Sequence, residues 1–278
     1  MALDQIQEDG DELEMGFLDH LEELRWHLIR SVIAIAAFSI LAFLGKTFVW
    51  DVLIFGPTQT DFWTNVQLCK LGDLINVSNL CLGELPITIQ NRQITGQFTM
   101  HIKSSAIIGV IVAFPYIFWE IWRFVSPGLK TNEKKASAGV VFTVSFLFLI
   151  GVLFGYFMIT PLSLNFLGNY SLSSRIDNEI DINSILGLVG TLSLACGLMF
   201  QLPMVSYMLS KAGILTPEMM KEYRRHSIVV ILVISAIITP PDVISQLLIA
   251  APILLLYEIS IIISRRVNNK FKKELYDL

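Results

Sequence analysis

Charged residues are scarce in this chain of 278 residues: Lys, Arg, Asp and Glu together make up 16% of it, against roughly 25% in an average soluble domain. Its four histidines show no HExxH or Cys/His ligand spacing, and no P-loop, nucleotide-binding glycine fingerprint or pair of nucleophile and base is present. These absences remove the sequence signals of metal, nucleotide and hydrolase chemistry. We therefore expect no metal, no cofactor, no nucleic-acid partner and no enzymatic activity.

Apolar residues dominate instead, at 54% of the chain, and they gather in runs long enough to cross a hydrocarbon core of roughly 30 Å. Six runs are interpreted as transmembrane helices: residues 31–49, 97–121, 136–159, 184–209, 227–238 and 243–263. The predicted fold class is an all-α polytopic integral membrane protein surrounded by membrane lipid. The first run is too long for the apolar region of a signal peptide and follows acidic residues, so we expect no cleavable leader.

Lys and Arg are concentrated in alternate connections between these runs, which predicts how the chain is oriented in the membrane. The basic connections contain Arg25, Arg30, Arg123, Lys130, Lys134, Lys135, Lys211, Lys221, Arg224, Arg225, Arg265, Arg266, Lys270, Lys272 and Lys273. The other connections hold far fewer, among them Lys70, Arg92 and Arg175. An even number of spans puts both termini on one side, so we expect both to be cytoplasmic.

The membrane domain is predicted over residues 15–266, between two polar ends. Residues 1–14 are acidic and without periodicity, which is typical of a disordered tail, and residues 267–278 are expected to form a cytoplasmic tail. Residues 50–96 form the longest connection, a large external loop. A connection of this length usually has structure of its own, and residues 87–90 alternate as in a short strand.

Two of the three cysteines, Cys69 and Cys81, fall in the external loop. They can form a disulfide if the loop faces an oxidising compartment, although spacing alone does not establish the geometry. The third cysteine, Cys196, lies inside the fourth span, where we interpret it as a small packing residue.

Prolines interrupt four of the predicted spans, at Pro115, Pro161, Pro203 and Pro252. Each one removes an intrahelical hydrogen bond and clashes with the preceding turn, so the helices are expected to kink and form a concave, cupped wall. In a bilayer such kinks persist only where neighbouring groups or water satisfy the freed carbonyls.

The fifth span is unusually short. At about 1.5 Å per residue, residues 227–238 reach only about 18 Å, which is less than a hydrocarbon core. Pro240 and Pro241 then turn the chain, and Asp242 is placed to cap the next helix. Two interpretations stay open: the short span thins the bilayer or is shielded by a partner helix, or residues 223–226 extend it into the headgroups.

A helix-patterned segment, residues 15–30, runs directly into the first span. Its apolar residues recur at helical spacing on one face; they are Phe17, Leu21, Leu24 and Leu28. The neighbouring flank is acidic and carries Asp19, Glu22 and Glu23. Helices on a cytoplasmic membrane surface usually carry Lys and Arg on this flank, because the leaflet is anionic. The acids therefore either keep the segment solvated or meet a cationic ligand.

Strongly polar groups inside spans are costly unless they are paired, so they are candidates for function. Gln201 lies nearest the middle of a span, where it can serve a carbonyl freed by Pro203 or line a wet cavity. Glu258 lies near the cytoplasmic end of the sixth span, within reach of a neighbouring helix. Glu120 and Arg123 are one helical turn apart, and we expect them to form an ordinary surface ion pair.

Three motifs follow one another along the chain: HLEELR at residues 20–25, FVSPGL at 124–129 with Glu133, and TPPDV at 239–243 with Ser245 and Gln246. Together they resemble the TatC family, the six-span subunit of the twin-arginine protein translocase. The resemblance covers the chain from about Phe17 to Arg266. It implies a cupped protein with both termini cytoplasmic, in a bacterial inner membrane rather than a thylakoid membrane. It also implies a signal-peptide receptor and translocase core that exports folded proteins by using the proton-motive force.

The resemblance assigns signal-peptide binding to Glu23, Leu24, Arg25, Phe124, Pro127 and Glu133. Glu23 and Glu133 match the two carboxylates that bind the paired arginines of the signal. The chemistry agrees, because a carboxylate accepts a guanidinium in a planar two-bond fork that Lys cannot copy. Taken alone, Glu133 is also typical of an acid near a helix N-terminus.

The resemblance also implies partners, namely single-span TatA- and TatB-type subunits, in a hetero-complex that contains several copies of this chain. Thr239 and Gln246 match the polar positions where a partner helix docks. The chain departs from the family pattern at Gln201, where many relatives carry Glu, and in its long external loop and acidic extension.

Two other classes of protein stay open as alternatives. An ion-coupled small-solute transporter would need discontinuous helices and ionisable groups at the midplane of matching repeats, and no such repeat is visible. A structural membrane scaffold would leave Glu23 and Glu133 dispensable.

Overall fold

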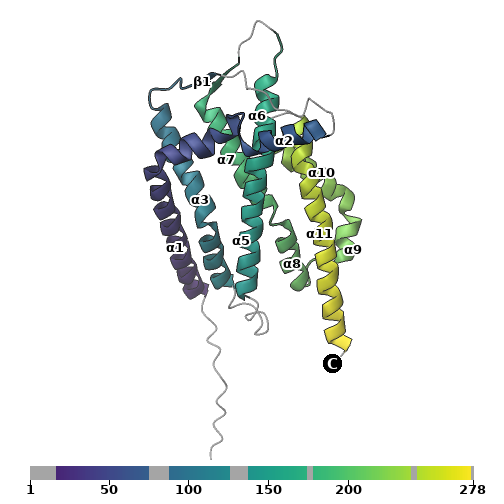
Figure 1. The fold of residues 1–278 in the computed structure, drawn as a ribbon. Helices are drawn as coiled ribbons and strands as arrows, with labels where there is room; N and C mark the ends of the chain where they lie inside the picture. The colour runs from purple at the N-terminus through teal and green to yellow at the C-terminus, as the bar shows by residue number, and fades with distance from the viewer. Residues whose placement is uncertain (1–16, 75–87, 126–136, 174–177, 239–242, 277–278) are drawn as a thin grey trace, which may run out of the picture.

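A computed structural model describes residues 17–74, 88–125, 137–173, 178–238 and 243–276 of the chain. Within them the fold is a bundle of long helices (Figure 1), which confirms the all-α prediction. Five segments of this described part are long and apolar enough to cross a membrane by length and composition: Glu22–Leu44, Gly96–Val125, Gly139–Asn169, Ile182–Lys211 and Gln246–Asn269. The chain is a multi-pass membrane protein.

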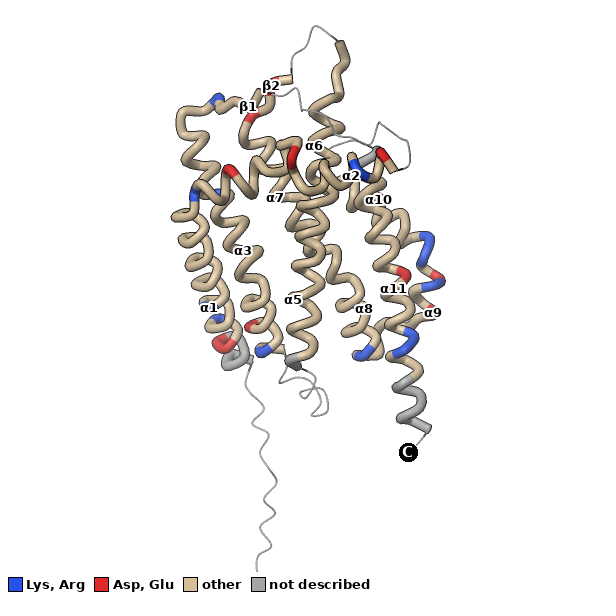
Figure 2. Tube along the Cα trace, in the orientation of Figure 1, with Lys and Arg blue, Asp and Glu red and all other residues tan. Residues whose placement is uncertain are grey.

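The described part of the chain begins and ends at the same end of the bundle. Helix α1 (Phe17–Leu44) starts there and α11 (Val243–Tyr276) finishes there (Figure 1). Along α1, α3 (Gly96–Val125) and α5 (Ser137–Phe154), charged residues lie mostly towards the two ends of the helices (Figure 2). Following the bias in Lys and Arg, we call the end that carries the start of α1 the cytoplasmic end and the opposite end the outer end.

The acidic segment and the first apolar run form one continuous helix, α1. Helix α3 (Gly96–Val125) runs along it and continues through Pro115 without a break. The two backbones come close at Gly109, where a Cβ would lie 2.1 Å from Ser39 Oγ and 2.9 Å from the carbonyl oxygen of Ile35. Small residues allow such an approach, and close packing replaces the hydrophobic drive that is missing between helices in lipid.

The third span contains a wide, π-helical turn just before Pro161. It consists of α5 (Ser137–Phe154), the π-helical turn η5 (Gly155–Ile159) and α6 (Thr160–Asn169). The hydroxyl of Thr160 donates to the carbonyl oxygen of Gly155 at 2.9 Å, and the backbone amide of Thr160 donates to the same oxygen. Gly155 also packs on the next span, where its Cβ would lie 2.7 Å from the carbonyl oxygen of Leu192.

The fourth predicted span is two helices rather than one. Helix α7 (Ile182–Met199) ends before Phe200 and Gln201, and α8 (Leu202–Lys211) begins after them, with Pro203 in its first turn. Proline is tolerated in a first turn because it has no amide hydrogen to contribute there. The kink expected at Pro203 is therefore a complete break in the helix. Cys196, one turn before this break, is a buried free cysteine, as its interpretation as a packing residue requires.

The short fifth span is α10 (Arg224–Ile238), whose 15 residues reach about 22 Å. It begins three residues earlier than predicted, which favours the extension towards the headgroups, yet it is still shorter than a hydrocarbon core of about 30 Å. The small helix α9 (Pro217–Glu222) precedes it. The hydroxyl of Tyr257 on α11 donates to the carbonyl oxygen of Met220 at 2.7 Å, which joins α9 to α11.

The external loop has structure of its own. After α1 the chain turns onto the bundle through the π-helical segment η1 (Phe48–Ile54), the 3-10 turn η2 (Gly56–Thr58) and α2 (Trp63–Leu74). Val49, Trp50 and Ile54 are buried against Met100 of α3 and against residues of α7, and together they form a hydrophobic cluster near the outer end.

A short strand joins two external connections. Strand β1 (Thr88–Gln90) pairs in parallel with β2 (Glu179–Asp181), with Ile89 opposite Ile180. This confirms the strand predicted near residues 87–90. Arg92 and Glu179 add an exposed ion pair at 3.2 Å, and Asp181 caps α7 by accepting from the amide of Asn183 at 2.9 Å.

The approach of α1 and α3 predicts how Gly109→Ala will behave. Its added Cβ forces Ser39 and the α1 backbone apart, so we expect the free energy of unfolding to fall by about 1–3 kcal/mol. The matched control is Gly187→Ala on α7, where no atom lies within 4 Å of the added Cβ; it should gain roughly 0.5–1 kcal/mol from helix propensity. Thermal unfolding of the detergent-solubilised variants measures both. Equal midpoints for the two variants would contradict the close approach.

Candidate functional site

The predicted signal-peptide site lies at the cytoplasmic end, where α1 begins and α3 ends. Glu23, Leu24 and Arg25 lie near the start of α1, and Phe124 is the penultimate residue of α3. Leu24 is 41% exposed and the side chain of Glu23 is 39% exposed. Pro127 and Glu133 lie outside the described residues, so the structure shows one side of the predicted site.

A buried carboxylate lies beside these residues. Glu120 of α3 is 0% exposed. Its Oε1 accepts a hydrogen bond from the hydroxyl of Tyr116 at 2.8 Å, and its Oε2 is bonded to Nδ1 of His27 on α1. Nη1 of Arg30 lies 3.9 Å from the same Oε2. A buried carboxylate is costly unless it is hydrogen-bonded and paired, and here donors from both helices meet that requirement.

The prediction of a surface ion pair between Glu120 and Arg123 is wrong, because Glu120 is buried and is bonded to His27. The guanidinium of Arg123 lies over the ring of Trp119, with Cζ 4.8 Å from the ring centroid. The i, i+3 spacing made Arg123 the nearest candidate on α3 itself, but the face of α3 that bears Glu120 packs on α1. The packing of α3 on α1 therefore makes His27 the partner of Glu120. The structure has this buried pair in place of the predicted solvated pair of Glu120 and Arg123.

His27 connects this buried carboxylate to the predicted binding residues. Its ring is 7% exposed, and its Nε2 lies 4.0 Å from Oε1 of Glu23, one helical turn before it. The edge of the same ring faces Phe124, with centroids 6.2 Å apart and an interplanar angle of 63°. Glu23 and Phe124 thus both lie close to His27, a residue that was not predicted to belong to the site. The only signal for it was the i, i+4 spacing of Glu23 and His27.

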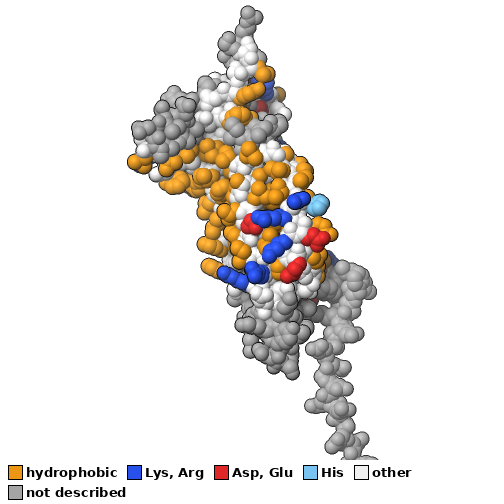
Figure 3. Space-filling view, turned by 90° about the vertical axis from the view of Figure 1, so that its right-hand side faces the viewer, with side chains coloured by type: hydrophobic (Ala, Val, Ile, Leu, Met, Phe, Trp, Pro, Cys, Tyr) orange, Lys and Arg blue, Asp and Glu red, His pale blue; other side chains and the backbone are white. Residues whose placement is uncertain are grey.

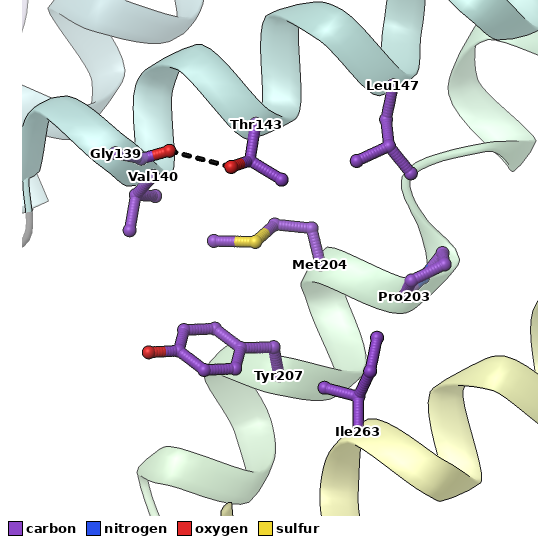
Figure 4. Close-up of a pocket in the computed structure, with 8 residues that line it drawn as sticks. All are labelled: Gly139, Val140, Thr143, Leu147, Pro203, Met204, Tyr207 and Ile263. Atoms are coloured by element: carbon purple, nitrogen blue, oxygen red, sulfur yellow. Dashed lines mark hydrogen bonds between the residues drawn. The ribbon is translucent and has the colours of Figure 1, made fainter.

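Gln201 lies at the break between α7 and α8. Its side-chain Nε2 donates to the carbonyl oxygen of Val144 on α5 at 3.0 Å, so it serves a neighbouring helix. A cavity of about 370 Å³ lies beside the break, between α5, α8 and α11 (Figure 4). It is lined by Gly139, Val140, Thr143, Leu147, Pro203, Met204, Tyr207 and Ile263. These residues are uncharged and mostly apolar, which is unsuitable for binding paired arginines.

The other predicted polar residues lie around α10 and α11. Gln246 donates through Nε2 to the carbonyl oxygen of Leu232 on α10 at 3.0 Å. Glu258 forms an ion pair with Arg224 of α10 at 2.5 Å. The predicted residues of the turn between these helices, Thr239, Pro240, Pro241 and Asp242, lie outside the described residues.

The cysteines and possible metal ligands can be placed only in part. Cys69 lies on α2, whereas Cys81 is outside the described residues, so their disulfide stays a prediction. Among the residues that the structure describes, no group of three or more His, Cys, Asp or Glu is placed to hold a metal ion.

Known proteins resemble this chain over most of its length. The family model described as Sec-independent protein translocase protein (TatC) matches residues 19–252. TatC of Blattabacterium sp. subsp. Periplaneta americana strain BPLAN is 38% identical over 259 residues, which cover 92% of this chain and 97% of the relative. TatC of Aquifex aeolicus strain VF5 is 34% identical over 262 residues, which cover 94% of this chain and 99% of the relative.

Two solved structures share the fold. One, described as the crystal structure of the twin arginine translocase receptor TatC, is 33% identical, has a TM-score of 0.68, and matches over 90% of this chain and 99% of its own. The other, the same receptor in the detergent DDM, has a TM-score of 0.71 at 33% identity and matches over 88% of this chain and 99% of its own.

The bundle defines a multi-pass membrane protein, and the relatives place it in the protein-transport class. The match to the family model and to full-length relatives makes the assignment specific: the chain belongs to the TatC family of Sec-independent protein translocase proteins. It is a component of a protein translocase in the membrane.

The bond from Gln201 to α5 predicts the effect of Gln201→Met. The variant keeps the length of the side chain but removes the donor to the Val144 carbonyl, so we expect a loss of about 1 kcal/mol in the free energy of unfolding. Thermal unfolding in detergent measures the change. Leu198→Met, at a position that is 59% exposed one turn earlier, is the control and should be neutral. A Gln201→Met variant as stable as this control would show that the bond contributes nothing.

Proposed function

We propose that this chain is the signal-peptide receptor and core subunit of a twin-arginine translocase, which exports folded proteins across a bacterial cytoplasmic membrane by using the proton-motive force. The observation that carries the proposal is Glu23, a partly exposed carboxylate at the cytoplasmic end, next to the exposed Leu24 and 4.0 Å from His27, whose ring contacts Phe124. The solved structures that share the fold are described as twin arginine translocase receptors, which supports the same role.

The chemistry of Glu23 suits a guanidinium ligand. A carboxylate with both oxygens accessible can accept two parallel N–H bonds from one arginine, and each charged hydrogen bond is worth about 1.5–3 kcal/mol. The leaflet below is anionic, so a free carboxylate there repels lipid headgroups and attracts cations. Glu133 and Pro127 are proposed to complete the site from the α3–α5 connection, with Glu133 as the carboxylate for the second arginine.

We also propose that TatA- and TatB-type single-span subunits dock on α10, within a hetero-complex that holds several copies of this chain. The residues Val229, Val230, Val233 and Ile237 of this helix are each more than half exposed. Figure 3 shows this side of the molecule, where an apolar surface continues above a cluster of charged side chains. Because α10 is too short to fill the hydrocarbon core, a neighbouring helix would relieve the mismatch. Thr239 and Gln246 are proposed to lie at the outer end of that contact.

Receptor function predicts that Glu23→Ala will reduce the crosslinking of a twin-arginine precursor to membranes that contain the complete translocase. The loss of one arginine fork should lower capture at least about tenfold. Glu133→Ala should act in the same direction.

The matched control for Glu23→Ala is Glu22→Ala, which removes the adjacent exposed carboxylate and should leave capture near the wild-type level. Wild-type capture by both Glu23→Ala and Glu133→Ala would instead favour the structural scaffold. A chain that moves small ions or solutes but captures no precursor would favour the ion-coupled transporter.

Partner docking predicts that Gln246→Leu weakens co-purification of the single-span subunit while precursor crosslinking stays intact. The amide is the polar group that we assign to the docking contact, and the wild-type side chain already bonds Leu232, so the effect should be partial, about threefold to tenfold. Gln97→Leu removes an exposed amide near the outer end of α3 and serves as the control. Recovery of the partner at wild-type yield from Gln246→Leu would contradict the docking role.

A further inference from the structure

We infer that His27 and Glu120 are positioning residues that orient Glu23 towards a guanidinium, and that they thereby set the preference of this receptor for arginine over lysine. The inference rests on the proposed binding of a twin-arginine signal at Glu23. It assigns a purpose to the buried carboxylate of α3, which the proposed binding chemistry does not otherwise use.

The carboxylate of Glu120 is held in place by its hydrogen-bond partners. Each of its carboxylate oxygens has a partner: Oε1 accepts from Tyr116, one turn earlier on α3, and Oε2 is bonded to His27 on α1. Arg30 adds a positive charge 3.9 Å from Oε2. With no exposed surface and with partners on both helices, Glu120 has little freedom to rotate. It therefore holds the His27 ring in one orientation.

His27 transmits this orientation to the exposed residue. The two nitrogens of an imidazole ring point in different directions, so one ring can face two carboxylates at once. Nδ1 is engaged by Glu120, and Nε2 lies 4.0 Å from Oε1 of Glu23. The edge contact with Phe124 restricts the same ring from the side of α3. Glu23 thus has one oxygen 4.0 Å from a ring that is itself held in place, which limits the rotamers available to its half-exposed side chain.

The orientation of Glu23 matters more for arginine than for lysine. A guanidinium presents its N–H groups in a rigid planar fork, so two-bond recognition requires the carboxylate plane to be aligned with it. An ammonium is a compact charge with rotatable donors and tolerates a carboxylate in many orientations. Freeing Glu23 to rotate should therefore weaken arginine binding and leave lysine binding nearly unchanged.

The experiment measures dissociation constants of two fluorescent signal peptides, one with the paired arginines and one with paired lysines, on membranes that contain the complete translocase. The variants are His27→Leu and Glu120→Leu. Each should weaken binding of the arginine peptide about tenfold, the equivalent of one charged hydrogen bond, with little change for the lysine peptide. The ratio of the lysine constant to the arginine constant should therefore fall about tenfold.

Controls separate positioning from folding. Glu258→Leu removes the carboxylate of the ion pair with Arg224, between α10 and α11, and should keep the wild-type ratio. If a leucine variant fails to assemble, Tyr116→Phe supplies a milder test, because it removes one donor to Glu120 and keeps the ring; it should lower the ratio about threefold. The number of binding sites at saturation reports how much protein is folded in each case.

The outcomes distinguish this inference from the function on which it rests. An unchanged ratio in the His27, Glu120 and Tyr116 variants, together with loss of arginine binding in Glu23→Ala, overturns the positioning role and leaves the receptor standing. Equal weakening of both peptides would make the two residues merely structural and overturns it as well. A wild-type membrane that binds neither peptide rejects the receptor and the inference together.

Discussion

The absence of water from the bilayer core is the constraint on which this structure depends. Backbone and side-chain polar groups at that depth must find partners inside the protein, so each irregularity in a helix needs a local remedy. The π-helical turn before Pro161 has the Thr160 hydroxyl bonded to a carbonyl of the widened turn. The break before Pro203 carries Gln201, whose amide donates to the backbone of α5. A hydrogen-bonding side chain thus lies at both of these irregularities.

The same constraint organises the cytoplasmic end. Glu120 is fully covered by the protein, so its carboxylate needs partners there. It is bonded to the imidazole of His27 on α1 and to the hydroxyl of Tyr116 on α3, and the guanidinium of Arg30 lies nearby. Helices α1 and α3 are already close because glycine permits contact at Gly109. Polar pairing then determines their alignment where the apolar contact ends. The result is a pair of carboxylates at the cytoplasmic end: Glu120 is buried and fully paired, and Glu23 is accessible to a ligand.

Much of the fold could be predicted from the sequence, because the length and apolarity of the runs are properties of single segments. The short fifth span and the strand near residue 88 belong to this class, whereas the proximity of Glu23 to the end of α3 was implied only by the resemblance to the TatC family. Glu120 could not be placed, since its environment depends on which face of α3 turns towards α1, a tertiary choice that spacing within one helix does not encode. The pairing of β1 with β2 could not be predicted for a similar reason, because a parallel pair of three residues leaves no pattern in the sequence of either strand.

The pairing of β1 with β2 has a mechanical consequence. It ties the connection between the first two long spans to the connection between the next two, and it is reinforced by the ion pair of Arg92 and Glu179 and by the cap that Asp181 places on α7. Helices fastened to one another at their outer ends cannot separate there without breaking this ladder.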